Sequence, residues 1–349
     1  MSGTSTMRCS ARAARRSPGS ARSCAPGPAP KAGSTGTASK QDRRERNMKN
    51  IPLIDLSSAG RGGTQAELEV AREIDRACRD IGFFTLCGHG IDRSVFDDAH
   101  AALTAFFALP VTDKLRCKLA TGPTLAADEY TPYGYSGVLE ENAYAHMGIV
   151  GRPNDHVEKF SAGRLILSDA NQLPFPETDL GRNLRQRLKA YYAACQALCN
   201  RLTELFTLGL DLPRNYFSQR IDRSNDSMRG HFYAGFTRDF DNDQGMGEHC
   251  DSTLLTLLTH TAPGLQVRTR DGRWITPEFY ELDHFIVNIG DLMAHWTKNA
   301  YVSTPHRVLL GMEARQSLAF FKLTNEDEMV MVGNKQMDAL LGRNRVSAP

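Results

Sequence analysis

The sequence has no long apolar run, because no stretch approaches the roughly 18 apolar residues that a membrane span requires. It also has little net charge: 42 Lys and Arg stand against 40 Asp and Glu, so nothing predicts a nucleic-acid surface. The eight cysteines are irregularly spaced and follow no secretory signal, which favours reduced thiols over a disulfide framework. We expect a soluble, cytoplasmic protein without membrane or nucleic-acid partners, and its oligomeric state stays open.

The first 47 residues lack acidic side chains before Asp42 and lack an apolar run that could nucleate packing. Their richness in Ser, Arg, Ala, Gly and Pro predicts a disordered leader over 1–47. An Arg- and Ser-rich leader also resembles an organelle transit peptide. Because Met48 directly precedes the first strand-like segment, a start-site artefact is the favoured explanation.

Beyond the leader, the spacing of apolar side chains predicts both helices and strands. At 349 residues the chain is long enough to bury one large core. Strands are expected over 51–56 and 83–87. Helices are expected over 64–82, 95–109 and 184–209, and the last has leucines spaced alternately by four and three residues.

Metal-ligand chemistry is predicted in the second half of the chain. Because side chains alternate along a strand, His249 and Asp251 would project to one side while Cys250 points to the other. A second strand carrying His306 would complete two imidazoles and one carboxylate, an arrangement that leaves positions on Fe(II) open. A His-x-Asp pattern often arises by chance, but each candidate here lies on or beside a strand-like run.

Nine residues after His306, Arg315 and Ser317 would share one strand face. A guanidinium beside a hydroxyl is suited to a carboxylate, because Arg offers two parallel N–H bonds to its two oxygens. Structural zinc sites are normally closed by four protein ligands. The three ligands predicted here therefore favour an open, reactive site, and a non-catalytic metal-binding protein is the alternative.

Several motifs, in the same order, make the chain resemble the isopenicillin N synthase and 2-oxoglutarate-dependent dioxygenase family. The matching segments are 50–56, 82–90, 285–299, 305–308 and 314–321. The resemblance implies a mainly β fold with flanking α elements, a distorted double-stranded β-helix (jelly roll) with helices packed outside. It also implies Fe(II) held by His249, Asp251 and His306, with 2-oxoglutarate and O2 as co-substrates. Arg315 and Ser317 would bind the distal carboxylate of 2-oxoglutarate, and Tyr233 would direct its phenol at the same group.

The resemblance also predicts how the chain is divided. An N-terminal region of helices, strands and lid loops is expected over 48–170, a jelly-roll core with a supporting long helix over 171–330, and a C-terminal tail over 331–349. Irregular loops of the length of 121–168 are usually functional or disordered. The candidate substrate contacts are Tyr133, Tyr135 and Phe321. Ordinary packing is the alternative for each tyrosine.

The implied reaction is oxidation of a small-molecule substrate, coupled to decarboxylation of 2-oxoglutarate to succinate and CO2. Halogenating relatives lack the carboxylate that Asp251 provides, so we expect hydroxylation, desaturation or oxidative cyclisation, in specialised, antibiotic-type metabolism. An isopenicillin N synthase-like oxidase that uses O2 without 2-oxoglutarate stays open, because 314–321 matches that branch closely. Against it, those synthases carry an arginine shortly before the Gly-Tyr pair, whereas here Thr131, Pro132 and Tyr133 precede Gly134 and Tyr135.

Overall fold

A computed structural model describes residues 51–60, 64–118, 133–164, 167, 174–238, 240–325, 327–332, 335–338 and 345–347. The leader predicted over 1–47 lies outside the described residues. Of the irregular stretch 121–168, residues 133–164 and 167 are described, and 121–132, 165, 166 and 168 lie outside the described residues. The predicted tail contains β14 (Lys335–Asp338) and β15 (Arg345–Ser347), which form a small sheet with β13 (Met329–Val332).

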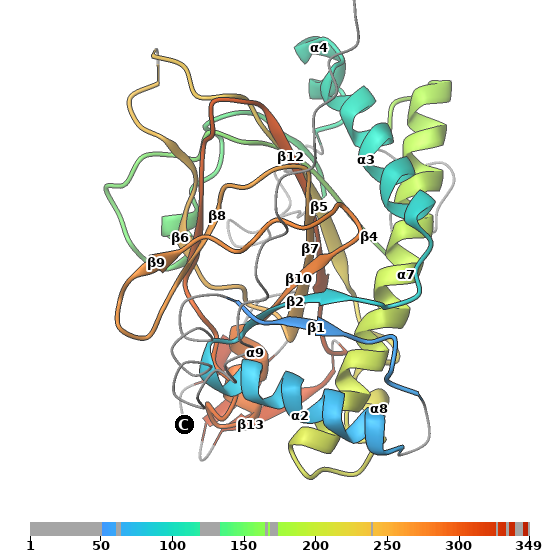
Figure 1. The fold of residues 1–349 in the computed structure, drawn as a ribbon. Coiled ribbons are helices and arrows are strands. Elements are labelled where there is room, and N and C mark those ends of the chain that lie inside the picture. Colours follow the sequence, from blue (N-terminus) through green and yellow to red (C-terminus); the bar gives the residue numbers. More distant parts are fainter. Residues whose placement is uncertain are drawn as a thin grey trace, which may run out of the picture.

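Two sheets enclose the interior of the molecule (Figure 1). The larger sheet has eight strands in the order β1 (Leu53–Asp55), β2 (Phe83–Cys87), β10 (Phe285–Ile289), β7 (Leu255–His260), β12 (Arg315–Lys322), β5 (Ser227–Tyr233), β4 (Glu158–Gly163) and β3 (Gly134–Ser136). The smaller sheet has the order β6 (Gln244–His249), β11 (His306–Leu309), β8 (Leu265–Arg268) and β9 (Trp274–Ile275). Strands from the predicted N-terminal region and from the predicted core therefore share one sheet.

Three long helices cover the outside of the larger sheet (Figure 1): α2 (Gln65–Asp80), α3 (Arg93–Phe107) and α7 (Asp179–Gly209). The Thr64 hydroxyl caps α2 by accepting a hydrogen bond from the Glu67 N–H at 3.1 Å, as the capping-box spacing predicts. The α7 helix begins earlier than predicted, because the Thr178 side chain accepts from the Gly181 N–H. Within the described part of the chain, no helix combines the length and apolar character that crossing a bilayer demands.

The shorter helices occupy connections between these elements. They are α4 (Val111–Leu115), α5 (Ala143–His146), α8 (Ser218–Ile221) and α9 (Asp291–Trp296). We call residues 137–157 the covering segment, because they connect β3 to β4 and carry α5, which packs beside β6.

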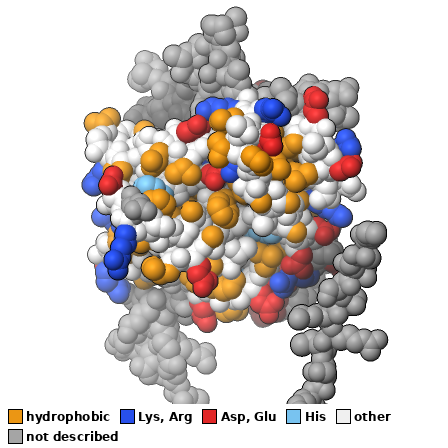
Figure 2. All heavy atoms as spheres, turned by 90° about the horizontal axis from the view of Figure 1, so that it is seen from above, with side chains coloured by type: hydrophobic (Ala, Val, Ile, Leu, Met, Phe, Trp, Pro, Cys, Tyr) orange, Lys and Arg blue, Asp and Glu red, His pale blue; other side chains and the backbone are white. Residues whose placement is uncertain are grey.

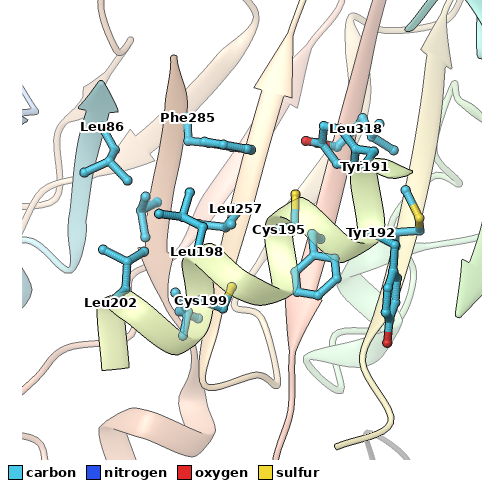
Figure 3. Close-up of a cluster of buried hydrophobic side chains, with 14 of the residues drawn as sticks. Leu86, Tyr191, Tyr192, Cys195, Leu198, Cys199, Leu202, Leu257, Phe285 and Leu318 are labelled. Carbon is cyan, nitrogen blue, oxygen red and sulfur yellow. The ribbon is translucent and has the colours of Figure 1, made fainter. Parts of the chain in front are cut away.

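Apolar side chains on the two faces of the larger sheet form two separate clusters. The outer cluster lies between this sheet and the helices, and Figure 3 shows Leu198 and Leu202 of α7 on the side facing Leu257 and Phe285. Each such leucine contributes about 1.5–3 kcal/mol by burial. The inner cluster lies between the two sheets. It includes Phe83, Tyr233, Val267, Ile286 and Val308.

Apolar and charged side chains occupy different parts of the surface seen in Figure 2. On this face, apolar side chains occupy a broad central area, and most of the charged groups lie toward its edge. The described residues form no broad basic area on this side, in keeping with the net charge of +2.

Candidate active site

The smaller sheet brings two histidines together. Strands β6 and β11 pair antiparallel with His249 opposite His306, and the two ring centroids are 4.3 Å apart. Asp251 follows directly beyond β6, and its Oδ1 lies 3.8 Å from Nε2 of each histidine. The three ligand atoms all lie within 4.8 Å of one another. A divalent ion that binds N and O ligands at about 2 Å could contact all three after small side-chain adjustments.

Hydrogen bonds orient both imidazoles toward a common point. His249 Nδ1 lies 2.8 Å from the Gly247 carbonyl, and His306 Nδ1 lies 3.1 Å from the Thr304 carbonyl. Because a carbonyl only accepts, each Nδ1 carries the proton and each Nε2 is left as a ligand. Burial is the main cause that lowers the pKa of His249, to about 3. The ring is therefore neutral at physiological pH, as a metal ligand must be.

Two side chains of the larger sheet hold the carboxylate of Asp251. Its Oδ2 accepts from the Thr256 hydroxyl at 2.7 Å and from the Asn288 amide at 2.8 Å, which leaves Oδ1 for a metal. Burial acts to raise the pKa of Asp251, but the two imidazoles and these two donors outweigh it, so the pKa is lowered. A Cβ on Gly290 would lie 2.7 Å from the Asp251 carbonyl oxygen, so this position favours glycine.

A second polar group projects between the sheets from β12. Arg315 lies opposite Tyr233 of β5, is 2% exposed, and donates through Nε to the Ala262 carbonyl at 3.2 Å. Its two terminal nitrogens, Nη1 and Nη2, are buried, and no described residue accepts a hydrogen bond from them. An unpaired buried charge is costly. The guanidinium is therefore suited to an anion with two oxygens, which is the shape of a carboxylate.

The neighbours of Arg315 complete a carboxylate-binding cradle. The Tyr233 ring lies beneath the guanidinium, with 4.8 Å from its centroid to Arg315 Cζ. Burial is the main cause that raises the pKa of Tyr233 to about 12, so its phenol stays protonated and can donate. Ser317 lies on the same face of β12 as Arg315, and its Oγ is 3.5 Å from His231 Nδ1. The arrangement fits 2-oxoglutarate, one end of which would reach the metal.

The covering segment closes the interior beside β6. Asp155 is fully buried, and its Oδ1 accepts from the Gly247 N–H at 2.9 Å and the Gln244 amide at 3.1 Å. Its Oδ2 accepts from the Ala143 N–H at 2.9 Å. These bonds fix the covering segment to the strand that carries His249.

The three predicted substrate contacts lie on different faces of the larger sheet. Phe321 shares the inner face of β12 with Arg315 and Ser317. Tyr135 lies opposite Phe160 on the outer face, is 4% exposed, and donates its hydroxyl to Glu158 at 2.8 Å. Tyr133 also packs against the outer cluster. The structure therefore does not support substrate contacts by Tyr133 and Tyr135, and it favours the packing alternative for both.

Other polar residues of the interior were not singled out from the sequence. Asn288 and Thr256 could have been found, because both lie on strand-like segments at alternating positions. Lys159 and Glu141 form a pair at 2.7 Å that joins β4 to the covering segment. No local pattern indicates that contact.

Fold and site together define a class of protein: a double-stranded β-helix with two histidines and one carboxylate for a metal, and a buried guanidinium for a co-substrate acid. The family described as "2OG-Fe(II) oxygenase superfamily" matches residues 224–324, and "non-haem dioxygenase in morphine synthesis N-terminal" matches residues 51–177. The chain belongs to the 2-oxoglutarate- and Fe(II)-dependent oxygenases, and it is an oxidoreductase that uses Fe(II), 2-oxoglutarate and O2.

Curated relatives match along most of the chain. Gibberellin 20 oxidase 2 of Arabidopsis thaliana is 30% identical over 289 residues, which cover 80% of this chain and 70% of that protein. Gibberellin 20 oxidase 1-B of Triticum aestivum is 29% identical over 297 residues, covering 83% and 76%. The 2-oxoglutarate-Fe(II) type oxidoreductase ppzC of Metarhizium majus is 28% identical over 312 residues, covering 82% and 81%.

Solved structures share the fold. JOX2 in complex with 2OG, Fe and JA has a TM-score of 0.67 at 26% identity, covering 82% of this chain and 78% of that one. A full-length Neurospora crassa protein in complex with alpha-KG has a TM-score of 0.71 at 24% identity, covering 83% and 93%. These comparisons favour the 2-oxoglutarate-dependent branch over an oxidase that needs no 2-oxoglutarate, and over a non-catalytic metal-binding protein.

Proposed function

We propose that this oxygenase hydroxylates, desaturates or oxidatively cyclises a small organic molecule in specialised metabolism. More narrowly, we propose that this metabolism is of the antibiotic type. The observation that carries the proposal is the pairing of two features between the same sheets: a three-ligand metal site, and a buried guanidinium with no protein acceptor on its terminal nitrogens. The names of the relatives, which include gibberellin 20 oxidases, support a small-molecule substrate.

The protein's residues position and shield the reactants in this proposal. When bound, Fe(II) would let O2 act as the oxidant, taking two electrons from 2-oxoglutarate, which leaves as succinate and CO2, and two from the substrate. His249 and His306 present their Nε2 atoms, because each Nδ1 faces a carbonyl, and Asp251 presents Oδ1. Arg315 binds the far carboxylate of 2-oxoglutarate through both terminal nitrogens, while Ser317 and Tyr233 stand beside it. Their burial excludes water from these charged groups.

The carboxylate of Asp251 bears on the type of reaction. It occupies the third protein position of the metal site, and Thr256 and Asn288 hold it there. A halide would need that position, so we propose oxygenation, desaturation or ring closure over halogenation.

The test is an incubation of Fe(II)-loaded protein with 2-oxoglutarate, O2, ascorbate and a panel of small organic molecules. We expect succinate release that a true substrate stimulates, and a product that has gained one oxygen or lost two hydrogens by mass spectrometry. Incorporation of halide from a chloride-containing buffer would contradict the proposal. Absence of iron-dependent succinate release would contradict it as well.

A reducing, cytoplasmic location is also our proposal. Its support is that all six cysteines among the described residues are free thiols. Cys195 and Cys199 lie within the outer cluster, where burial raises the thiol pKa of both above its usual range. Buried, protonated thiols of this kind are inert packing groups.

A further inference from the structure

The inner face of the larger sheet carries a second guanidinium, which the functions assigned above do not use. Arg229 of β5 pairs with Ala319 of β12 and with Ser161 of β4. Because side chains alternate along a strand, Arg229 projects to the same face as His231 and Tyr233. That face encloses the metal site and the cradle around Arg315.

Arg229 lies at the level of the metal site. Its Cζ is 5.7 Å from the centroid of the Phe321 ring. Phe321 pairs across the sheet with Thr256, the residue whose hydroxyl holds the metal-binding carboxylate of Asp251. A molecule that contacts Arg229 and lies along Phe321 would therefore extend toward the metal ligands.

The guanidinium of Arg229 has no direct counter-ion in the described part of the chain. No described carboxylate forms an ion pair with it, and its one close contact of note is with the face of Phe321. A guanidinium has five N–H donors in a fixed fork. Arg229 is half-buried, so its donors are available to water or to a ligand.

The nearby carboxylates make their direct contacts with other groups, although Glu141 also feels the charge of Arg229. Glu141 binds Lys159 Nζ at 2.7 Å, and Lys159 is only 4% exposed. Burial opposes ionisation of Glu141, but Lys159 and Arg229 outweigh it and lower its pKa to about 2. Asp155 is held by N–H groups of the covering segment and β6. His231 lies on β5 between Arg229 and Tyr233, and it is neutral because burial lowers its pKa well below the usual value.

The site at Arg229 is separate from the one at Arg315. Arg229 and Tyr233 are four residues apart on β5, a span of about 13 Å at about 3.3 Å per residue, and Tyr233 is the residue paired with Arg315. The two guanidinium groups therefore contact different rings, Phe321 for Arg229 and Tyr233 for Arg315. If Arg315 takes the far end of 2-oxoglutarate, Arg229 is left for a different molecule.

We propose that the primary substrate carries a carboxylate, which Arg229 binds while the carbon skeleton lies along Phe321 toward the metal ligands. This inference rests on the proposed function and narrows its substrate class to organic acids. Lys159 and Glu141 form the polar wall beside the bound group, and Phe321 holds the guanidinium plane. Neutral molecules of the same shape leave Arg229 without a partner and bind more weakly.

The experiment compares aromatic and alicyclic monocarboxylic acids with their primary amides. Binding is measured by calorimetry on protein loaded with Mn(II) and 2-oxoglutarate, and stimulation of succinate release is measured on the Fe(II) form. We expect at least one acid to bind about ten- to hundredfold more tightly than its amide, the range for a hydrogen bond to a charged group. Arg229→Gln should remove that preference, and Arg229→Lys should retain part of it.

Two controls make the outcome decisive. Arg223→Gln removes an exposed arginine that pairs with Asp327, and it should leave the preference for acids intact. Thermal unfolding of each variant shows whether it has folded. A panel in which no acid outperforms its amide overturns the proposal, and so does an Arg229→Gln variant that folds and keeps the preference. Failure of the proposed function looks different: the unsubstituted protein would then release no succinate with any compound.

Discussion

Replacing Arg315 with methionine should separate co-substrate binding from stability, because the guanidinium is buried without a protein acceptor for its terminal nitrogens. Methionine keeps most of the side-chain volume and removes the charge. Losing one partner of a buried charged pair costs about 2–5 kcal/mol. At about 1.4 kcal/mol per decade, the affinity for 2-oxoglutarate should fall roughly thirtyfold to several thousandfold.

In the protein without co-substrate, the same substitution should not lower stability and should tend to raise it. Burial disfavours the charged form of Arg315 and lowers its pKa. The Nε bond to Ala262 and the Tyr233 ring beneath the guanidinium offset that cost only in part. Uncompensated buried charge destabilises by a few kcal/mol. Arg315→Met should therefore unfold at an equal or higher temperature than the unsubstituted protein when both lack 2-oxoglutarate.

Thermal unfolding with and without 2-oxoglutarate measures both effects. A ligand at about 100 times its Kd adds about 2.7 kcal/mol to the free energy of unfolding, and this gain should disappear in Arg315→Met. Arg307→Met is a matched control, since Arg307 is partly buried, bonds Gln266 and lies over Trp274 on the smaller sheet. Unchanged affinity for 2-oxoglutarate in Arg315→Met would refute the assignment.

Three further outcomes are expected. His249→Ala should abolish stoichiometric Fe(II) binding, measured by metal analysis after desalting, whereas His284→Ala should not, and equal losses would mean that the ligands are misassigned. Thr256→Val removes one donor to Asp251 and should weaken Mn(II) binding about 10- to 100-fold by calorimetry; an unchanged Kd would contradict that role. Burial lowers the pKa of His100 to about 4, below its usual 6.5, so the unfolded chain binds its proton first and stability is lost as pH falls from about 6.5 to about 4. Over this pH range the loss in the free energy of unfolding amounts to about 3 kcal/mol. Denaturant titrations should show a smaller loss for His100→Gln, and an equal loss in the variant would refute this role of His100.

The metal ligands could be predicted because their spacing carries the geometry. His249 ends β6 and Asp251 lies two residues further on, so alternation continued past the strand end predicts both on one side. Arg315 and Ser317 follow the same rule on β12. In each case a local period of two was enough to indicate which side chains share a face.

The faces of Tyr133 and Tyr135 could not be predicted in this way. Strands β4 and β10 are buried along nearly their whole length, because helices cover one face and the smaller sheet covers the other. Such strands show no contrast between an apolar and a polar side. The face that carries Tyr135 depends on its register with Phe160, which only the assembled sheet sets.

The pair of Glu141 and Lys159 escaped prediction for a different reason. It joins the covering segment to β4. That segment is held in place where Asp155 accepts from the Ala143 and Gly247 N–H groups. Its existence depends on tertiary contacts that leave no periodic trace in the sequence. The proposed role of Arg229 depends on these tertiary contacts and could not be predicted from the sequence.

The interleaving of early and late strands has a consequence for how the protein matures. β10 lies between β2 and β7, and β12 lies between β7 and β5, so the middle of the larger sheet is filled by segments synthesised near the end of translation. A chain emerging from the ribosome cannot hold iron until His306 has left the exit tunnel and β11 has docked on β6. Such non-local pairing folds slowly. Nascent chains of this protein should therefore depend on chaperones to shield the apolar faces of β5 and β7 until the last strands arrive.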